Sequence, residues 1–252
     1  MNDPGDANQG WCAGPPRAVS PTPCKRSHLI LGIKVVSYAS PRWRLHFSPR
    51  NSLPVPPNAS ARRNELRAQL RQRRRALFAA ERMAAAQAVA QRLRELPILQ
   101  TRSHVAGYWA TDGELPLHFL LAPAPGFVYC LPCLAPGKTL RFAPWRFGDA
   151  LVQNRYGIPE PDLSAESQLP PEAMSAVLVP LTAFDRTGRR LGSGGGYYDR
   201  AFAFLREQQR PATPLLIGIG YSFQEIDALP GEDWDVPLDL IVTERETIHP
   251  PR

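Results

Sequence analysis

The stretch VLVPLTAFDRTGRRLGSGGGYYDR, residues 177–200, decides the fold of this chain. It begins with the apolar run Val177–Leu181, which lacks polar alternation and therefore predicts a strand buried on both faces. A glycine-rich turn at 192–196 follows, and the sequence beyond it predicts a helix from Tyr197 to about Glu207. A buried strand, a glycine turn and a helix in this order are typical of an open α/β sheet.

The same alternation extends to both sides of this stretch. Further apolar runs predict strands, and two amphipathic patterns predict a pair of helices between residue 62 and Pro97. The other predicted strands are Val105–Trp109, Phe127–Leu131, Thr139–Trp145, Leu215–Tyr221 and Leu240–Thr243, with a short helix at Leu117–Leu121. Apolar strands separated by helices indicate an α/β fold whose mostly parallel sheet is covered on both faces.

Residues 1–60 differ in composition from the rest of the chain. The 252-residue sequence has a net charge of +7, and residues 1–60 hold 10 of its 28 prolines and 7 Lys and Arg against 2 Asp and Glu. Because no apolar pattern here would bury a face, we expect a disordered, proline-rich basic extension before a catalytic domain at 61–252. A targeting or RNA-binding arm is the functional alternative, whereas the scattered charge favours an unstructured extension, or a start codon assigned too early.

Composition also limits the class of protein. The sequence has no apolar run of about 18 residues, so we expect no transmembrane helix. It shows no secretory signal in its first residues, which predicts a cytoplasmic protein. Four cysteines are too few for a disulfide framework. Cys130 and Cys133 form a CxxC pair with no second pair nearby, which favours two buried thiols over a zinc or redox site.

The glycine-rich turn is the strongest candidate for a ligand site. Four of the residues 192–196 are glycines, so the backbone can approach a ligand closely, and the N-terminus of the following helix adds positive charge. The turn fits neither GxxxxGK[ST] nor GxGxxG, because Tyr197 stands at the last glycine position. Arg189 and Arg190 offer cations for phosphate oxygens, and Asp199 could hold a magnesium ion that bridges them.

Two other segments carry candidate ligand contacts. Arg63, Arg67 and Arg71 share one helical face, which is either a polyphosphate clamp or, as the sequence alone favours, a solvated surface. Glu114 follows the predicted strand that ends at Trp109, where open α/β sheets bind ligands, so this carboxylate and this ring could contact a heterocycle. On the sequence alone, a turn acid and a core aromatic are the simpler interpretation.

Taken together, these motifs resemble the 5-formyltetrahydrofolate cyclo-ligase family, also called 5,10-methenyltetrahydrofolate synthetases. The resemblance covers residues 62 to about 244 and rests on FDRTGRRLGSGGGYYDR at 184–200, RRNELRAQLRQRRRAL at 62–77 and WDVPL at 234–238. It implies a three-layer α/β/α fold with a mostly parallel open sheet. It also implies the Mg²⁺- and ATP-dependent cyclisation of 5-formyltetrahydrofolate to 5,10-methenyltetrahydrofolate, with release of ADP and phosphate.

The resemblance further implies roles for particular residues. ATP would bind at Arg63, Arg67, Arg190, Leu191, Gly192, Ser193, Gly194, Gly195, Gly196, Tyr197 and Tyr198. The folate would contact Trp109, Glu114, Ser193, Gly194, Gly195, Gly196 and Tyr197. Arg190 and Tyr198 would be catalytic, and Asp199 and Asp235 would hold Mg²⁺. Some relatives carry Lys where this chain has Gly195, so Arg189, Arg190 or the N-terminal arginines must supply that cation here.

Two other functions stay open at this point. Sugar-phosphate isomerases and CoA transferases share the architecture but need no ATP, so nucleotide dependence would distinguish them. An RNA-binding protein would use the basic extension and the arginine helix, although no aromatic residues interleave with the basic run. Phosphoryl transfer asks for positioning and charge neutralisation, which arginines, glycines and carboxylates provide. The resemblance implies ATP and 5-formyltetrahydrofolate as partners, and we expect neither nucleic acid nor a membrane.

Overall fold

The computed structural model describes residues 59–251. The first helix, α1 (Ala59–Arg75), begins before the expected domain start at 61. The extension predicted at 1–60 therefore lies outside the described residues, except for residues 59–60, which belong to this helix and are not disordered. Within 59–251, no helix is long and apolar enough to cross a membrane.

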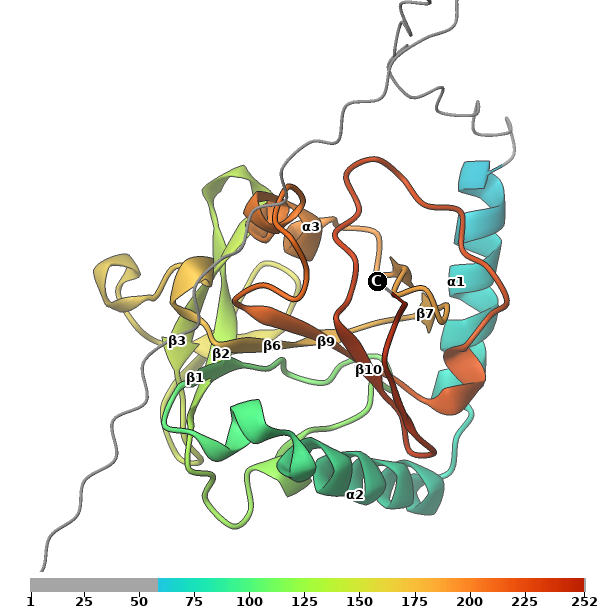
Figure 1. Cartoon of the computed structure of the whole chain (residues 1–252). Coiled ribbons are helices and arrows are strands. Elements are labelled where there is room, and N and C mark those ends of the chain that lie inside the picture. Colours follow the sequence, from blue (N-terminus) through green and yellow to red (C-terminus); the bar gives the residue numbers. More distant parts are fainter. Residues whose placement is uncertain (1–58, 252) are drawn as a thin grey trace, which may run out of the picture. The chain divides into compact units, whose positions relative to one another are not determined.

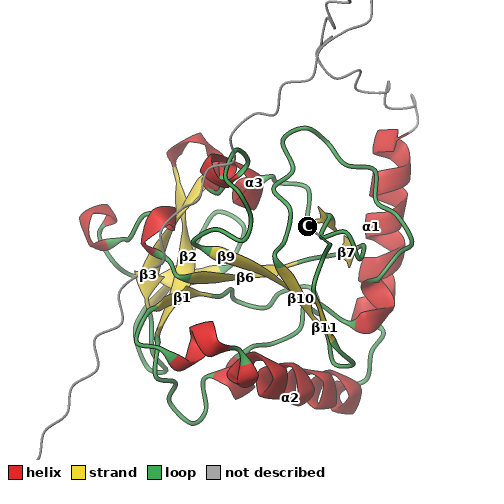
Figure 2. Cartoon of the chain, viewed as in Figure 1, coloured by secondary structure: helices red, strands yellow, loops and turns green. Residues whose placement is uncertain are grey.

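A seven-stranded sheet forms the centre of the described domain (Figures 1 and 2). Its strand order is β11-β10-β9-β6-β1-β2-β3. The strands are β1 (His104–Ala106), β2 (Val128–Ala135), β3 (Thr139–Pro144), β6 (Ala176–Pro180), β9 (Leu215–Ile219), β10 (Leu240–Val242) and β11 (Thr247–Ile248). The strands from β10 to β2 run parallel, while β3 and β11 pair antiparallel at the two edges. The predicted mostly parallel open sheet is confirmed.

Both faces of this sheet are buried, as the apolar runs predict. In β6, Leu178 packs in the core that contains α2 (Ala79–Glu95). Its neighbours Val177 and Val179 pack in a second core with Phe202, because successive strand residues point to opposite faces. Figure 1 shows α2 along one face of the sheet and α3 (Tyr197–Ala201) on the other, which gives the three-layer architecture.

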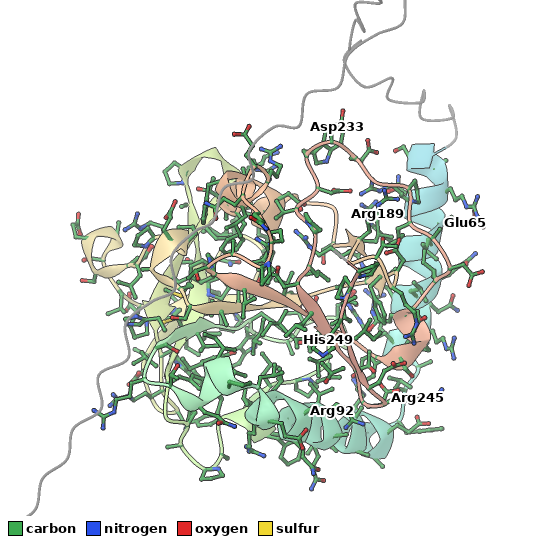
Figure 3. All side chains as sticks on the ribbon, in the orientation of Figure 1. Glu65, Arg92, Arg189, Asp233, Arg245 and His249 are labelled. Atoms are coloured by element: carbon green, nitrogen blue, oxygen red, sulfur yellow. The ribbon has the colours of Figure 1, made fainter. Side chains whose placement is uncertain are left out.

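The two long helices form as their patterns predict and then pack differently. α2 buries Val89, Ala90 and Leu93 against the sheet and ends two residues before Pro97. Arg92 on its outer side donates a hydrogen bond to the backbone carbonyl of Arg245 at 2.5 Å, which ties α2 to the last hairpin (Figure 3). α1 packs instead on a small hairpin of β7 (Ala183–Phe184) and β8 (Arg190–Leu191).

The helix after the glycine turn is shorter than predicted. α3 ends at Ala201 rather than near Glu207, and a separate 3₁₀ turn, Ala203–Leu205, follows it. The backbone leaves helical geometry at Phe202, where φ is −108° and ψ is 18°. Phe202 and Leu205 are both buried, so this break serves packing that the helical pattern alone does not reveal.

The helix predicted at Leu117–Leu121 is only the 3₁₀ turn His118–Leu120. Prolines at 116 and 123 leave too short a segment between them for an α-helix. β1 also ends earlier than predicted, at Ala106, so that Trp109 belongs to the loop that follows the strand. This early end turns the chain toward the rim of the sheet, where the candidate site lies.

Two structural features were not predicted. β4 (Leu151–Gln153) and β5 (Pro159–Pro161) form a hairpin, and β7 pairs with β8 in another. These strands are two or three residues long, which is too short for a visible sequence period. As a result, Arg190 and Leu191 of the predicted nucleotide loop are in fact strand residues.

The cysteine pair of β2 behaves as two buried thiols. Cys130 and Cys133 are both free and buried. Burial raises the pKa of each thiol to about 12, so few thiolates form at neutral pH. This environment fits the predicted packing role rather than redox chemistry.

Candidate active site

A cavity of about 560 Å³ opens beside the carboxyl ends of the parallel strands. The predicted site residues that line it are Arg63, Arg67, Trp109, Glu114, Arg190, Gly192, Ser193, Gly194, Gly195, Gly196, Tyr197, Tyr198, Asp199 and Asp235. Leu191 does not line it, because this side chain is buried with Leu70 of α1 and Leu229. The fold thus brings four segments, distant in sequence, to one cavity.

The arginine face of α1 forms one wall. Arg63 pairs with Glu232 at 3.1 Å and lies 3.8 Å from Asp235. One turn later, Arg67 donates to the carbonyl of Gly192 at 3.0 Å, and Arg71 donates to the carbonyl of Ser193 at 3.0 Å. The face that the sequence alone favours as a solvated surface therefore points at the glycine turn.

This wall carries a concentrated positive charge. Partial burial lowers the pKa of Arg67, and the neighbouring charges of Arg63 and Arg71 lower it further. The repulsion among these like charges raises the free energy of the ligand-free protein, and an anionic ligand in the cavity would reduce that repulsion. The wall is therefore suited to phosphate groups.

The glycine turn faces this wall. It connects β8 to α3, and Ser193, Gly194 and Gly195 are exposed to solvent. Gly194 and Gly196 have φ values of 101° and 65°, a region that favours glycine. The turn therefore depends on glycine for its shape and leaves its backbone open to a ligand.

A partly buried ion pair joins the strand before the turn to the helix after it. Arg190 is 8% exposed and donates to Asp199 Oδ1 at 2.5 Å and to the backbone carbonyl of Val236. Asp235 lines the cavity beside this pair, and its pKa is raised by burial, with the charge of Asp199 as a smaller cause. The two carboxylates predicted to hold Mg²⁺ thus interact electrostatically, although each already has an arginine partner, Arg190 for Asp199 and Arg63 for Asp235.

The donor set fits a magnesium ion only in part. Mg²⁺ is usually held by one or two carboxylates together with substrate phosphates and water. Asp199 and Asp235 supply two carboxylates that line the same cavity as the arginine face of α1. In the described part of the chain, no group of three or more His, Cys, Asp or Glu could hold a metal by itself. The residues present fit a metal that arrives with a nucleotide.

Glu114 lies in a tight turn that packs against the C-terminal part of α1. Asp112 and Gly113 both have positive φ, 53° and 75°, and the amide of Glu114 donates to the carbonyl of Thr111 at 2.8 Å. The carboxylate of Glu114 folds back onto the amide of Thr111 at 3.1 Å. Burial raises the pKa of Glu114, while the Thr111 hydrogen bond and Arg74 oppose this shift. A desolvated carboxylate of this kind is a strong acceptor for ring N–H groups.

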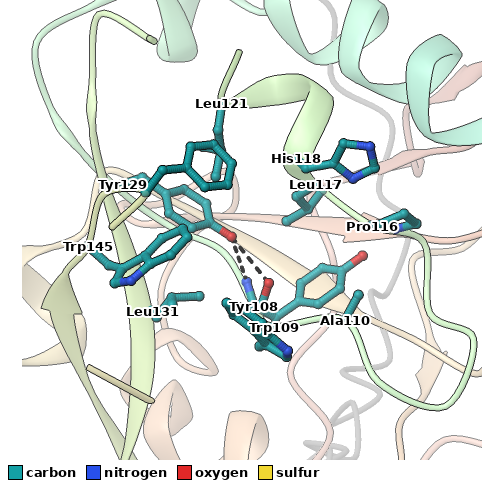
Figure 4. Close-up of a pocket in the computed structure, with 11 residues that line it drawn as sticks. Tyr108, Trp109, Ala110, Pro116, Leu117, His118, Leu121, Tyr129, Leu131 and Trp145 are labelled. Carbon is teal, nitrogen blue, oxygen red and sulfur yellow. Dashed lines mark hydrogen bonds between the residues drawn. The ribbon is translucent and has the colours of Figure 1, made fainter. Parts of the chain in front are cut away.

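Aromatic residues complete the wall around Glu114. Burial raises the pKa of the hydroxyls of Tyr108 and Tyr198 well above the ordinary value, so both stay protonated. Trp109 lines the cavity and also a second, mostly apolar one of about 320 Å³ (Figure 4). Its ring meets the edge of Trp145 at 5.8 Å between centroids. Trp109, which the sequence alone favours as a core aromatic, therefore lies between two cavities, and 36% of its surface is exposed.

The β4–β5 hairpin covers the remaining side. Tyr156 at its tip lies 2.8 Å from the hydroxyl of Tyr197, which also receives a hydrogen bond from Arg155. The side chain of Asn154 accepts from the amides of Tyr156 and Ile158, and so holds the tip in shape. An Asn followed by Gly three residues later is a turn signal that could have shown this hairpin.

Comparisons with known proteins place this site in a family. Residues 59–244 match the model of the 5-formyltetrahydrofolate cyclo-ligase family. The 5-formyltetrahydrofolate cyclo-ligase of Escherichia coli (strain K12) is 38% identical over 179 residues, which cover 69% of this chain and 96% of that protein. The corresponding protein of Haemophilus influenzae is 34% identical over 190 residues, 72% of this chain and 97% of its own. This chain belongs to the 5-formyltetrahydrofolate cyclo-ligase family.

Solved structures agree with this assignment to the cyclo-ligase family. The 5,10-methenyltetrahydrofolate synthetase of Aquifex aeolicus has a TM-score of 0.62 and 31% identity, covering 74% of this chain and 92% of that one. The synthetase of Mycoplasma pneumoniae has a TM-score of 0.55 and 27% identity, covering 72% and 98%. The family match includes every residue that lines the main cavity.

Several cavity residues of this family member were not predicted as site residues. They are Arg74, Tyr108, Thr111, Asp112, Pro132, Leu134, Leu140, Asn154, Tyr156, Ile158, Pro180 and Trp234. Arg71 also lines the cavity, and the sequence named it only as part of the possible polyphosphate clamp. Only the direction of Arg71 and Arg74 in the fold separates them from solvated neighbours. Leu134 and Leu140 come from the antiparallel pair β2–β3, whose apolar pattern signals burial and not a ligand.

Proposed function

We propose that this chain closes 5-formyltetrahydrofolate to 5,10-methenyltetrahydrofolate and converts ATP to ADP and phosphate in the process. Membership of the cyclo-ligase family supports this activity. The observation that carries it is that one cavity holds both parts of such a site. One part is cationic and glycine-rich, and the other is aromatic and contains the buried carboxylate of Glu114. The first part suits a triphosphate and the second a pterin.

The proposed reaction uses phosphate to activate the formyl group. The oxygen of the N5-formyl group attacks the γ-phosphorus of ATP, and ADP leaves with the electrons of the broken P–O bond. The lone pair of N10 then attacks the formyl carbon, phosphate leaves from that carbon, and N10 gives up its proton. These steps need oriented substrates and neutralised charge, and no nucleophilic side chain.

The residues divide between the two substrates by their place in the cavity. Arg63, Arg67 and the turn from Gly192 to Tyr197 would bind the phosphates, since Arg67 already reaches the carbonyl of Gly192 and Arg63 lies one helical turn away on the same face. Glu114 and Trp109 would contact the pterin, and part of the turn would reach the folate as well. These assignments are the ones that the family resemblance implies, and the place of the residues in the cavity supports them.

Two residues are proposed to act at the reacting groups. Arg190 would add positive charge where the phosphate develops, and its bonds to Asp199 and Val236 fix its orientation. Tyr198 is a protonated hydroxyl in the same cavity, so it would donate a hydrogen bond and not accept a proton. Asp199 and Asp235 would hold Mg²⁺, which would neutralise phosphate charge when it is bound with ATP.

The proposed function is tested by following absorbance of the methenyl product. We expect product from 5-formyltetrahydrofolate only when Mg²⁺ and ATP are both present, with one ADP formed for each turnover. Product without nucleotide would contradict the ATP-dependent reaction. Activity that needs neither 5-formyltetrahydrofolate nor a nucleotide would instead support the isomerase or transferase alternative. RNA binding that weakens steeply with salt would instead support the nucleic-acid alternative.

A further inference from the structure

Arg74 is a buried cation for which the proposed reaction gives no role. It lies on α1 among exposed arginines, yet it is only 2% exposed. Removing a guanidinium from water costs free energy unless its donors are paired. The fold therefore has to hold Arg74 through specific contacts, and these contacts show what it does.

The guanidinium of Arg74 joins three elements. Its Nε donates to the backbone carbonyl of Asp112 at 2.9 Å, and its Nη2 donates to the Asp112 carboxylate at 3.3 Å. Its Nη1 lies 3.4 Å from the carbonyl of Leu181, just after β6. Its Nη2 is also 4.0 Å from Glu114 Oε1. One planar fork thus links α1, the Thr111–Glu114 turn and the end of a central strand.

The turn lies directly against the helix at this point. A Cβ on Gly113 would be 3.1 Å from the backbone carbonyl of Arg74. Arg71 and Arg75 also reach the Asp112 carboxylate, but from more exposed positions. Among the ion pairs of residues 59–251, only the one formed by Arg74 includes Glu114. Arg74 is therefore the link between Glu114 and α1.

We propose that Arg74 is a positioning residue that fixes the Thr111–Glu114 turn against α1 and so sets the place of the Glu114 carboxylate relative to Arg63 and Arg67. The proposal rests on the proposed function, because it assigns Glu114 to the folate and α1 to the nucleotide. It makes the geometry between the two substrates depend on one guanidinium whose hydrogen bonds all go to the protein itself.

The test replaces the guanidinium group of Arg74 but keeps its positive charge. Arg74→Lys removes the geometry that satisfies Asp112 and Leu181 together. We expect kcat/KM for 5-formyltetrahydrofolate to fall about tenfold or more, with the KM for ATP changed less than about twofold. Arg63 and Arg67 keep their own anchors at Glu232 and Gly192, which is why ATP should be spared. Arg62→Lys, at an exposed position of the same helix, is the matched control.

A second variant moves the turn without touching the buried charge. Gly113→Ala places a methyl group against the carbonyl of Arg74 at a φ of 75°. It should reproduce the selective loss of folate use, and it keeps the proposal testable if Arg74→Lys fails to fold. In the double variant Arg74→Lys/Glu114→Gln, the loss should not exceed that of Glu114→Gln alone, because Arg74 acts through Glu114.

The pH profile separates positioning from a merely structural role. The charged and titratable groups that face Glu114 are Arg74, Asp112, Tyr108, Tyr198 and Tyr221. Of these groups, Arg74 lowers the pKa of Glu114 and Asp112 raises it. A displaced Arg74 should therefore move the acid limb of folate kcat/KM to higher pH, while a structural defect would lower the whole profile.

The outcomes distinguish this proposal from the proposed function. If the wild-type chain makes no methenyl product, the proposed function fails, and 5-formyltetrahydrofolate binding measured by calorimetry tests Arg74 in its place. If the wild type is active, an unchanged folate kcat/KM in both Arg74→Lys and Gly113→Ala would overturn the positioning role. An equal loss for ATP and folate, with no shift of the acid limb, would overturn it too.

Discussion

Arg67 differs from the other arginines of the cavity in its side-chain partners. Arg63, Arg74 and Arg190 each form an ion pair with a carboxylate. Arg67 donates only to the Gly192 carbonyl and to the side chain of Asn64, and within residues 59–251 it forms no ion pair. A cation whose charge is not neutralised locally is the one most available to an anionic ligand.

Arg67→Met should therefore weaken nucleotide use more than folate use. The change keeps much of the aliphatic length and removes the charge, so we expect the KM for ATP to rise roughly tenfold or more. Steady-state kinetics with each substrate varied in turn measure this effect, and Arg62→Met serves as the control. Equal changes in both KM values would place Arg67 outside the nucleotide site.

Glu114→Gln should weaken folate use and spare ATP. The swap keeps the shape of the side chain but replaces one acceptor oxygen by a donor and removes the charge. Because burial raises the pKa of Glu114, folate kcat/KM in the wild type should fall as pH drops through a value above that of an ordinary carboxyl. The variant should lose this limb. An acid limb that survives in Glu114→Gln would assign it to another group.

Asp199→Asn tests a residue with two partners, the proposed Mg²⁺ and the guanidinium of Arg190. If Asp199 holds Mg²⁺, the variant should lose turnover across a magnesium titration. The ion pair with Arg190 adds a second expectation, because a guanidinium with a 5% exposed side chain loses its counter-charge. We expect roughly 1–3 kcal/mol of lost stability in thermal or urea unfolding. Wild-type turnover at every magnesium concentration would rule out the metal role.

At the scale of elements, the glycine turn combines two kinds of glycine. Gly196 has a φ of 65°, and a Cβ there would be 2.8 Å from Nη1 of Arg200, whereas a Cβ on Gly192 would meet nothing within 4 Å. Arg200 also donates to the carbonyl of Gly195 and lies over the ring of Tyr197. The C-terminal half of the turn is therefore constrained, and its first residue is not.

Gly196→Ala should destabilise the ligand-free protein by roughly 1–2 kcal/mol, because a left-handed backbone penalises a Cβ and Arg200 must move. Gly192→Ala is the matched control and should leave the melting temperature nearly unchanged. Both are measured by calorimetry without ligand, so that any clash with a nucleotide does not enter. Similar melting temperatures for the two variants would show that the conformation of the turn does not require glycine.

The sequence predicts the elements whose pattern is local. Val177–Leu181 predicts β6 because a strand buried on both faces shows as an unbroken apolar run. The same reasoning fails for β7 and β8, since two residues carry no period. It also extends α3 too far, because only the fold shows that Phe202 has to enter the core.

At the scale of the whole molecule, the site depends on contacts across long distances in sequence. Arg67 reaches Gly192, and Arg74 reaches Asp112, only because α1 packs beside the β7–β8 hairpin. No spacing rule brings residues of α1 and of the glycine turn together, which is why the residues alone favour a solvated arginine face. The family resemblance implies that these segments share a site, and they do line one cavity. It can imply this because a resemblance brings the family's fold along with its motifs.

Removal of residues 1–58 is the prediction that concerns the chain as a whole. The family match begins at residue 59, and the relative from Escherichia coli is matched over 96% of its length by 69% of this chain. The contacts that hold the cavity in the described structure join residues between 63 and 236. A chain that starts at Ala59 should therefore keep its melting temperature, and its turnover should stay within about twofold of that of the full chain.

The cut belongs at 58 and not at 60, because α1 already begins at Ala59. A large loss of stability or turnover in this variant, compared with the full chain under the same conditions, would show that the N-terminal segment packs on the domain or takes part in the reaction.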